Sequence, residues 1–462
     1  MIQSADDQID ELREALGTGA LERSDALADR LHPADAARLF SELDEGGKAS
    51  MVEVFDHEQT AAMISHLSAA DVGTLLRMVP VQEEGQILAE LEDDDLVDIL
   101  QDMDGRQQKH CLKLLPDSKK RIAHQLLRYP EDTAGGRMTT NLATLRPEMT
   151  IGEAIEKLRQ RAESTEVLSR LFVVDENNRF LGKVRLRDLT FTQRDVQVRD
   201  IMQDTLIAVP AETDQEEAVR IMSKYDIFAL PVIDADFKLL GVITHDDALE
   251  IQEEENTEDL ERQSAIAGEV DDTNYLDTPI FRHIRRRFSW ILFLAFLAII
   301  SGLVIFKYED LLESYFVLTI YMPMIVAAGG NTGGQAATMV IRAMALDEFK
   351  PSAIFRVAWK ETRIGLVIGS LLGIFIAAQI LIYMPFETDL PTGVTFAHIA
   401  GTVGIALTLQ ITCSTLIGAV LPILAKMGKL DPAVVASPAI TTIVDILGLV
   451  IYFGLAKGML GL

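Results

Sequence analysis

The chain has 462 residues, and its 70 acidic against 42 basic side chains give a formal net charge of −28. Residues 281–462 carry 10 acidic and 13 basic side chains, so residues 1–280 carry a net charge of −31. This division excludes a single soluble globule and a disordered acidic chain, and the lack of clustered Lys and Arg argues against nucleic-acid binding. At about 100–200 residues per domain, the length predicts two to four domains.

The N-terminal segment MIQSADDQIDELRE is acidic and has no apolar core, so it does not resemble a secretory signal. We therefore expect residues 1–280 to be cytoplasmic. Cys111 and Cys413 are the two cysteines, and the chain has no C-x-x-C or Cys/His spacing. Zinc, iron–sulfur and disulfide frameworks are accordingly unsupported.

Residues 1–130 have the pattern of short amphipathic helices separated by recurring helix-breaking positions, as in LHPADAARLFSEL and LSAADVGTLLRMVP. Asp35, Asp71 and Asp95 recur within this pattern, each shortly after a leucine and before an apolar set with helical spacing. This recurrence predicts an acidic α-helical array rather than a single bundle.

A second kind of repeat occupies residues 131–250. Met138, Pro147 and Ala154 recur in the same order, and at nearly the same offset, as Met202, Pro210 and Ala218. Each copy then shows two apolar runs, the first of them LFVVD at 171–175 and LPVID at 230–234. We predict two helix–strand–strand–helix copies that form one α/β module, with Gly182 and Gly241 at the turns into the second strands.

The remainder of the chain predicts a membrane domain. A charged connecting helix is expected over 251–283, followed by a transmembrane domain over 284–462. Five stretches reach the roughly 20 apolar residues that cross a bilayer. The predicted spans are 288–306, 314–341, 364–386, 399–424 and 432–456. Connections rich in Lys and Arg alternate with connections that carry no excess positive charge. This alternation is expected for a protein of the cell membrane with a cytoplasmic N-terminus and an extracytoplasmic C-terminus.

One acidic residue falls near the middle of the last predicted span. An unpaired carboxylate such as Asp445 costs about 2.5–3.5 kcal/mol at that depth, so a functional role is the default interpretation. Ser437, Thr441 and Asp445 follow one another at intervals of four and share a helix face, as a cation path requires. Neutralisation of Asp445 by protonation or by a neighbouring helix is the structural alternative. Asp431 precedes Pro432 as a helix N-cap, and attraction of cations is its second possible role.

The second predicted span contains the sequence GGNTGGQ, residues 329–335. No Lys follows these glycines, so a phosphate-binding loop is excluded. Small residues four apart predict close helix packing. A broken or water-lining helix, in which carbonyl groups and Asn331 face ions, is the second interpretation.

The tandem α/β repeat resembles paired cystathionine β-synthase (CBS) domains. The whole order of an acidic helical domain, a CBS pair, a charged helix and five spans resembles the MgtE family of magnesium channels. Its most specific marks are GGNTGGQ and the stretch from Asp431-Pro432 to Asp445; Gly334 stands where family members often have Asn. The resemblance implies a homodimer in the lipid bilayer, a pore lined by the second and fifth spans, and Asp445 as the ion-selecting carboxylate.

The resemblance also implies regulatory magnesium sites on the cytoplasmic acids. The residues that match the family's sites are Asp95, Asp214, Glu216, Asp226, Asp247, Glu255, Glu258 and Asp259. Like charges repel across such surfaces unless cations intervene, and Mg²⁺ binds through one or two carboxylates while it keeps several waters. Family CBS pairs can also bind ATP, for which Asp246 is a candidate ribose ligand.

These features together predict a passive Mg²⁺ channel that closes when cytoplasmic Mg²⁺ bridges the acidic surfaces. A proton-coupled divalent carrier is the nearest alternative, and a nucleotide-responsive CBS receptor is another. An enzyme is not expected, because the chain shows no nucleophile–base set and no metal-ligand cluster.

Overall fold

The computed structural model describes residues 5–18, 21–160, 167–204, 207–264, 266, 275, 278–346, 348–383 and 394–460. Residues 1–255 and 271–275 form one compact unit, and residues 256–270 and 276–462 form a second. The two units are described separately.

The first unit begins with a helical array. Its ten helices are α1 (Ala5–Thr18), α2 (Leu21–Ala28), α3 (Pro33–Glu42), α4 (Glu45–Val54), α5 (His57–Ile64), α6 (Ala69–Met78), α7 (Val81–Glu90), α8 (Asp93–Asp102), α9 (Gly105–Leu114) and α10 (Asp117–Leu126). From α3 to α10 the helix starts are evenly spaced, at positions 33, 45, 57, 69, 81, 93, 105 and 117. We call this constant interval the helix repeat. Asp35, Asp71 and Asp95 are separated by whole numbers of helix repeats, and the predicted helical array is confirmed.

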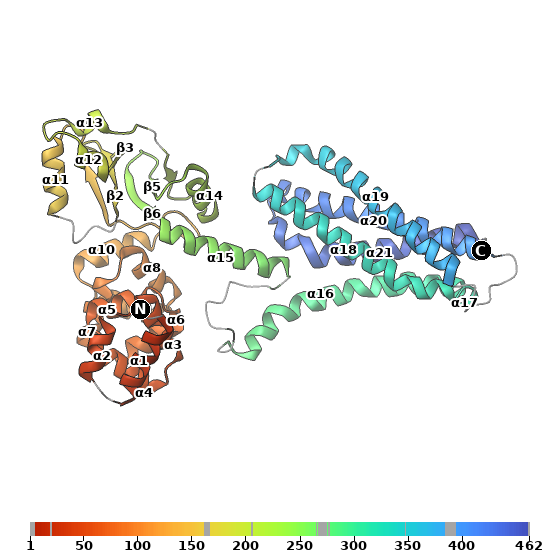
Figure 1. Cartoon of the computed structure of the whole chain (residues 1–462), viewed down its shortest axis with the longest axis horizontal. Helices are drawn as coiled ribbons and strands as arrows, with labels where there is room; N and C mark the ends of the chain where they lie inside the picture. The colour runs from red at the N-terminus through yellow and green to blue at the C-terminus, as the bar shows by residue number, and fades with distance from the viewer. Residues whose placement is uncertain are drawn as a thin grey trace. The chain divides into compact units, whose positions relative to one another are not determined.

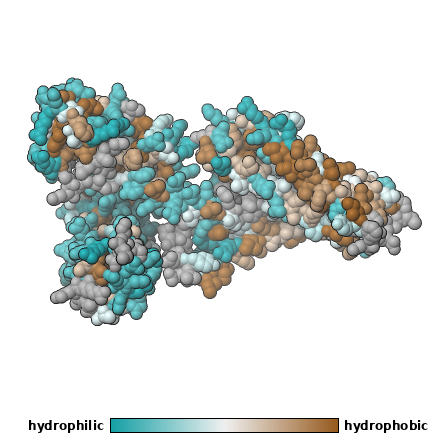
Figure 2. All heavy atoms as spheres, in the orientation of Figure 1, coloured by the Kyte–Doolittle hydropathy of each residue, from teal (hydrophilic) through white to brown (hydrophobic). Residues whose placement is uncertain are grey.

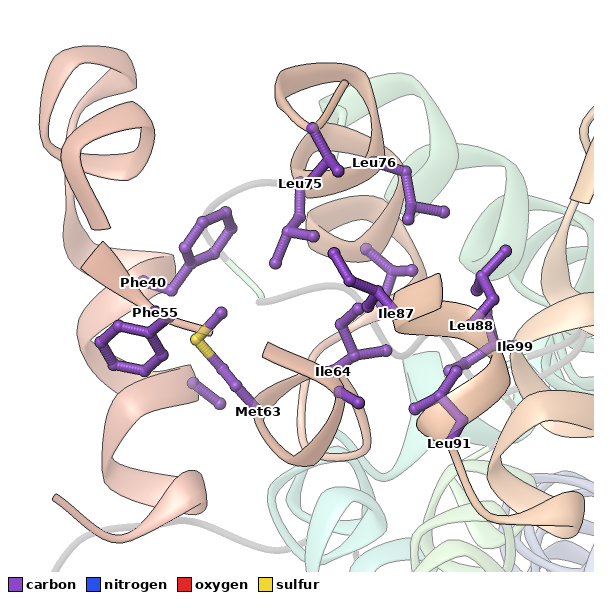
Figure 3. Close-up of a cluster of buried hydrophobic side chains, with 14 of the residues drawn as sticks. Phe40, Phe55, Met63, Ile64, Leu75, Leu76, Ile87, Leu88, Leu91 and Ile99 are labelled. Carbon is purple, nitrogen blue, oxygen red and sulfur yellow. The ribbon is translucent and has the colours of Figure 1, made fainter. Parts of the chain in front are cut away.

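The helix repeat has a local cause at the helix ends. Phe55, Val79, Leu91 and Leu115 each follow a helix in an extended conformation, which stops the helix. All four side chains are buried in the core of the array, so burial of apolar surface holds the chain in these turns. Figure 3 shows Phe55 and Leu91 among the helix residues of this core, such as Leu88.

The rest of the first unit contains two three-stranded sheets of the same topology. In sheet β1-β2-β3 the first pair is parallel and the second antiparallel, and sheet β4-β5-β6 repeats this order. The strands are β1 (Leu142–Leu145), β2 (Val167–Val174), β3 (Phe180–Arg185), β4 (Val209–Pro210), β5 (Ala229–Ile233) and β6 (Leu239–Thr244). The helices are α11 (Ile151–Arg159), α12 (Leu186–Phe191), α13 (Val198–Ile201), α14 (Gln215–Tyr225) and α15 (His245–Gln263).

Gly182 and Gly241 do not lie at turns as predicted, because they are inside β3 and β6. A Cβ atom on Gly182 would lie 2.4 Å from the carbonyl oxygen of Gln203, and one on Gly241 would lie 2.6 Å from that of Thr139. Each copy therefore closes the sheet of the other by backbone contact. The turns are built instead by Asp175 and Asp234, whose carboxylates accept hydrogen bonds from the following backbone amides.

The second unit is helical. Its elements after α15 are α16 (Ile280–Lys307), α17 (Glu309–Ser314), α18 (Val317–Ala345), the 3₁₀ turn η1 (Pro351–Ala353), α19 (Ile354–Tyr383), α20 (Phe396–Met427) and α21 (Pro432–Leu460). The connecting helix expected over 251–283 is shorter, since α15 ends at Gln263 and the residues from Ile280 belong to α16. In Figure 1 the long helices α18 to α21 lie side by side, and α20 packs against the other three.

Within the described residues, four helices have the length and apolar composition of membrane spans. They are Ile280–Lys307, Pro351–Tyr383, Phe396–Met427 and Ile440–Leu460. α18 matches the second predicted span in position and length, but GGNTGGQ lowers its mean hydropathy. A fifth span at α18 therefore remains a prediction. Figure 2 shows hydrophobic side chains over the surface of this unit, as expected for helices that face lipid.

Candidate functional site

The glycine-rich segment of α18 packs directly against α20 and α21. α18 runs unbroken from Val317 to Ala345, so the structure supports close packing and not the broken helix. A Cβ atom on Gly418 of α20 would lie 2.1 Å from the carbonyl oxygen of Gly333. Backbone therefore meets backbone at this crossing.

Asp445 lies against the same segment of α18. A Cβ atom on Gly330 would lie 3.0 Å from Cγ2 of Thr441 and 3.6 Å from Oδ1 of Asp445. Oδ1 of Asp445 is buried and has no hydrogen-bond partner in the described part of the chain. The side chain of Ser437 lies outside the described residues. Asn331 is exposed.

A second group of charges forms where α21 begins. Asp431 precedes Pro432 and accepts a 2.7 Å hydrogen bond from Arg262 at the end of α15. Arg262 also forms an ion pair with Glu258. Desolvation raises the pKa of Asp259, the Asp431 carboxylate raises it further, and Arg262 opposes both. Three predicted acids thus converge on one arginine that the sequence analysis did not single out.

The first unit gathers another acidic group between α8 and α15. Oδ2 of Asp95 accepts a 2.6 Å hydrogen bond from Ser65. Burial raises the pKa of Asp95, the Ser65 hydrogen bond offsets part of the shift, and the nearby Asp246 raises it again. Burial also raises the pKa of Asp247 to about 6, with further contributions from Asp246 and Asp95.

Glu250 belongs to the same group, although the sequence analysis missed it. Desolvation raises its pKa to about 7, and the carboxylates of Asp247 and Asp95 add to the shift. Its position one helical turn after Asp247 on α15 was the available signal. We call Asp95, Asp246, Asp247 and Glu250 the α8/α15 acidic cluster.

Next to this cluster a partly buried arginine joins α8 to α15. Arg137 donates to Asp98 at 3.0 Å and to Gln215 at 3.0 Å, and it also pairs with Glu254. Gln215 in turn donates to Glu255 at 2.6 Å. Burial raises the pKa of Asp98 to about 7, although Arg137 lowers it.

The remaining predicted acids are not gathered. Asp214 caps α14 by accepting from the amide of Glu216 at 2.9 Å, and both residues are exposed. Asp226 ends the same helix in a left-handed conformation with φ of 52°. The 11 residues of α14 separate the two ends by about 16 Å. In the described ranges, no three His, Cys, Asp or Glu side chains are placed so that they alone hold a metal ion.

Two surface hollows flank α14 in the second sheet module. One, of about 270 Å³, is lined by Asp226, Phe228 and His245 among others. The other, of about 500 Å³, is lined by Arg220, Lys224 and Tyr225 among others. Asp246, the predicted ribose ligand, lines neither of them and lies instead in the α8/α15 acidic cluster.

Comparisons with known proteins match this architecture. The family model for a divalent cation transporter matches residues 322–455, the model for the MgtE intracellular N domain matches residues 31–132, and the CBS domain model matches residues 134–194 and 198–254. The magnesium transporter MgtE of Thermus thermophilus is 32% identical over 97% of this chain and 98% of its own. The chain belongs to the MgtE family.

Other relatives agree with this membership. The magnesium transporter MgtE of Bacillus subtilis is 30% identical over 94% of this chain and 93% of its own. A crystal structure of the cytosolic domain of the Mg²⁺ channel MgtE in complex with ATP is 33% identical, covers 53% of this chain and 99% of its own, and has a TM-score of 0.51.

The resemblance inferred from sequence is thereby confirmed. The family is one of divalent cation transporters, and among the described residues four helices of this chain have the length and apolar composition of membrane spans. The inosine-5′-monophosphate dehydrogenase of Methanocaldococcus jannaschii is 29% identical over 24% of this chain and 21% of its own, a likeness too short to carry enzyme activity across.

Proposed function

We propose that this MgtE chain is a passive, Mg²⁺-selective channel that cytoplasmic Mg²⁺ closes. The observation that carries the gating part is the α8/α15 acidic cluster, in which carboxylates from distant parts of the chain are packed together without an ion pair among the described residues. Such packing is unfavourable unless protons or cations are taken up.

Asp95 of this cluster can be compared with Asp71, which holds the equivalent position in the helical array. Ser41 and Asp71 lie two helix repeats before Ser65 and Asp95, and both pairs form the same hydrogen bond, at 2.8 and 2.6 Å. Lys48 pairs with Asp71 at 2.8 Å. The position two helix repeats after Lys48 is Val72, which is fully buried.

The two aspartates therefore hold equivalent positions in the helical array, but the charged side chains around them differ. Burial raises the pKa of Asp71, but hydrogen bonds from Lys48 and Ser41 outweigh burial, and the resulting pKa is below its ordinary value. Among the described residues no lysine is recorded as donating a hydrogen bond to Asp95; burial raises its pKa, and the Ser65 hydrogen bond and the charges of His66 and Lys119 offset only part of that shift. A divalent cation shared with Asp247 would supply the missing positive charge at this position, as Lys48 does for Asp71.

The start of α21 offers a second place for regulatory Mg²⁺. Glu258, Asp259 and Asp431 stand close enough for Arg262 to interact with all three. An ion bound by these acids ties the end of α15 to the helix that carries Asp445. Closure in this proposal therefore acts on α21 directly. We keep Asp214, Glu216, Asp226 and Glu255 as candidate ligands that take part when partner surfaces or waters complete a site.

Asp445 is the proposed selecting carboxylate of the pore. In a homodimer, two copies of Asp445 face one another and hold a largely hydrated ion, with Thr441, Ser437 and Asn331 along the path and Asp431 at the cytoplasmic mouth. With the N-terminus in the cytoplasm, a divalent ion that enters gains about 4.6 kcal/mol per 100 mV, twice the single-charge value. No ATP-driven step is required.

The test of this pore is Mg²⁺ uptake into liposomes under an inside-negative potential. Asp445→Asn should abolish most of the flux because the neutral amide has no negative charge to attract and hold the divalent ion. Asp310 on α17 is exposed, and Asp310→Asn removes the same charge away from the Asp445 contact, so it should leave the flux unchanged. Full flux in Asp445→Asn would contradict the assignment.

A proton-coupled carrier predicts something different in the same vesicles. Its Mg²⁺ flux depends on an imposed pH gradient, whereas channel flux depends on voltage and Mg²⁺ alone. A nucleotide-responsive receptor predicts no flux at all.

Adenine nucleotide binding by the CBS pair is a second proposal for this chain. It is favoured by the hollow beside α14, whose lining includes Arg220, paired with Glu217, and Lys224, which lies over the Tyr225 ring; these cations are the candidate contacts for phosphates. Titration of the purified chain with ATP tests it. Lys224→Ala should weaken binding, and unchanged binding would place the nucleotide elsewhere, including at Asp246.

A further inference from the structure

Gln410 on α20 hydrogen-bonds to the backbone of α21 beside the proposed selecting carboxylate. Its Nε2 donates to the carbonyl oxygen of Val444 at 2.8 Å, and Val444 immediately precedes Asp445. Gln410 is fully buried. Nothing in the sequence singled it out, because a glutamine in an apolar span carries no periodic signal.

The orientation of this amide is fixed by its surroundings. A rotation that exchanged the two amide atoms would place Oε1 against the carbonyl oxygen of Val444, where two acceptors repel. Oε1 itself is buried without a hydrogen-bond partner in the described chain. The amide thus gives up one hydrogen bond so that its donor reaches α21.

Two glycines from different helices make the space for it. A Cβ atom on Gly329 of α18 would lie 2.2 Å from Nε2 of Gln410, and one on Gly448 of α21 would lie 2.5 Å from the same atom. Since Val444 and Gly448 are one helical turn apart, the missing side chain of Gly448 opens the approach to the Val444 carbonyl. The glutamine is therefore clamped between α18 and α21.

One face of α21 contacts Gln410 and the glycine segment of α18, and the adjacent face carries Asp445. Ile440, Val444 and Gly448 follow at intervals of four and face the glycine segment of α18 and Gln410. Thr441 and Asp445 lie one residue further along and face Gly330. Val444 and Asp445 are about 100° apart around the same helix, so a rotation of α21 that broke the Gln410 contact would also move the Asp445 carboxylate from its place.

We propose that Gln410 is a positioning residue for ion selection, which fixes the rotation and height of α21 and thereby the place of Asp445. The proposal rests on the function assigned above to Asp445. It predicts that loss of the Gln410 donor changes which ions pass more than it changes whether the protein folds.

The main test compares liposome flux of Mg²⁺ with flux of Ca²⁺ and Co²⁺ for Gln410→Met, which keeps the length of the side chain and removes the donor. The ratio of Mg²⁺ to competitor flux should fall by roughly two- to tenfold, the range that one neutral hydrogen bond supports. Ser414→Ala is the matched control, because its buried hydroxyl lies one turn away on the same helix and has no partner among the described residues. Its ratio should equal that of the native chain.

A second set of variants reaches the same contact from α21. Gly448→Ala should lower the ratio because its methyl group displaces the amide. Gly454→Ala on the same helix meets nothing within 4 Å among the described residues and should leave the ratio unchanged. The double variant of Gly448→Ala and Gln410→Ala should be no worse than the more affected single variant, since the clash is gone.

The outcomes separate this proposal from the one it rests on. If Asp445→Asn retains flux, the pore assignment fails. If Asp445→Asn loses flux while Gln410→Met and Gly448→Ala keep the native ion ratio, the role of Gln410 is structural and the proposal is wrong. If Gln410→Met does not give a folded protein, the ion ratio of Gly448→Ala against Gly454→Ala decides.

Discussion

Arg262, at the end of α15, donates a 2.7 Å hydrogen bond to Asp431, the residue before α21. The two residues are 169 positions apart in the chain. The guanidinium also pairs with Glu258 and partly offsets the raised pKa of Asp259. The Arg262 guanidinium therefore supplies the positive charge that a bound cation would bring to these three acids.

Arg262→Gln is expected to make closure depend more steeply on Mg²⁺. Without the guanidinium, the acids of α15 and Asp431 repel one another until an ion binds. In Mg²⁺-free buffer the variant should be open more often than the native chain, and at saturating Mg²⁺ it should close fully. Flux recorded across a range of internal Mg²⁺ measures this. A titration curve identical to that of the native chain would show that Arg262 does not compete with the ion.

Asp95→Asn and Asp71→Asn should have opposite effects, although the two positions are equivalent in the helical array. Asp95→Asn removes one charge from the α8/α15 acidic cluster and keeps an acceptor for Ser65, so the first unit should stay compact at lower Mg²⁺. Limited proteolysis of the intact protein across a Mg²⁺ titration measures this, with cleavage near residues 130 and 260 as the readout. K⁺ serves as the control ion.

Asp71→Asn instead leaves Lys48 without its ion-pair partner. We expect a loss of about 1–3 kcal/mol in the free energy of unfolding and no change in Mg²⁺ dependence. If the two variants behaved alike, the charge difference between the repeats would have no regulatory meaning.

The stability of the first unit should fall as the pH rises from about 5 to 8 in the absence of Mg²⁺. Burial raises the folded-state pKa of Asp247 to about 6 and that of Asp98 to about 7, so the folded state binds more protons than the unfolded state in this window. Glu250 shifts in the same direction, but its exposure to solvent weakens its contribution.

Thermal unfolding of the fragment 1–263 at pH 5 and pH 8, with chelator and with Mg²⁺, measures this effect. The midpoint should be several degrees higher at pH 5 with chelator, and Mg²⁺ should narrow the difference because the ion replaces the protons. A midpoint that rises from pH 5 to pH 8 would contradict the placement of these carboxylates.

The glycines of the membrane unit should differ sharply in their tolerance of alanine. Gly418→Ala places a methyl group 2.1 Å from a backbone carbonyl oxygen that cannot move aside easily, and a loss of about 1–3 kcal/mol or more is expected. Gly334→Ala meets nothing within 4 Å among the described residues. Detergent stability of the two variants, followed by size-exclusion chromatography after heating, is the comparison. Equal stability would mean that α18 and α20 are less tightly packed than the structure shows.

The sequence by itself determined the local periodic features. Recurring short helices, a tandem α/β repeat and apolar runs of membrane length follow from the neighbours of each residue in the chain, because burial at a fixed period selects helix or strand. Asp445 was also identifiable, since a carboxylate in an apolar run is expensive wherever the run folds.

Only the tertiary structure decided which distant side chains meet. It placed Asp95 beside Asp247, Arg262 beside Asp431, and Gln410 beside the carbonyl of Val444. It also moved Gly182 and Gly241 from predicted turns into strands, where the backbone of the other repeat approaches. Such contacts depend on how whole elements pack, and one sequence holds no record of the crossing of two helices or of the charge that a neighbour brings. The physical reason is range: periodicity acts between near neighbours in the chain, whereas packing and electrostatics join side chains as far apart in sequence as Arg262 and Asp431.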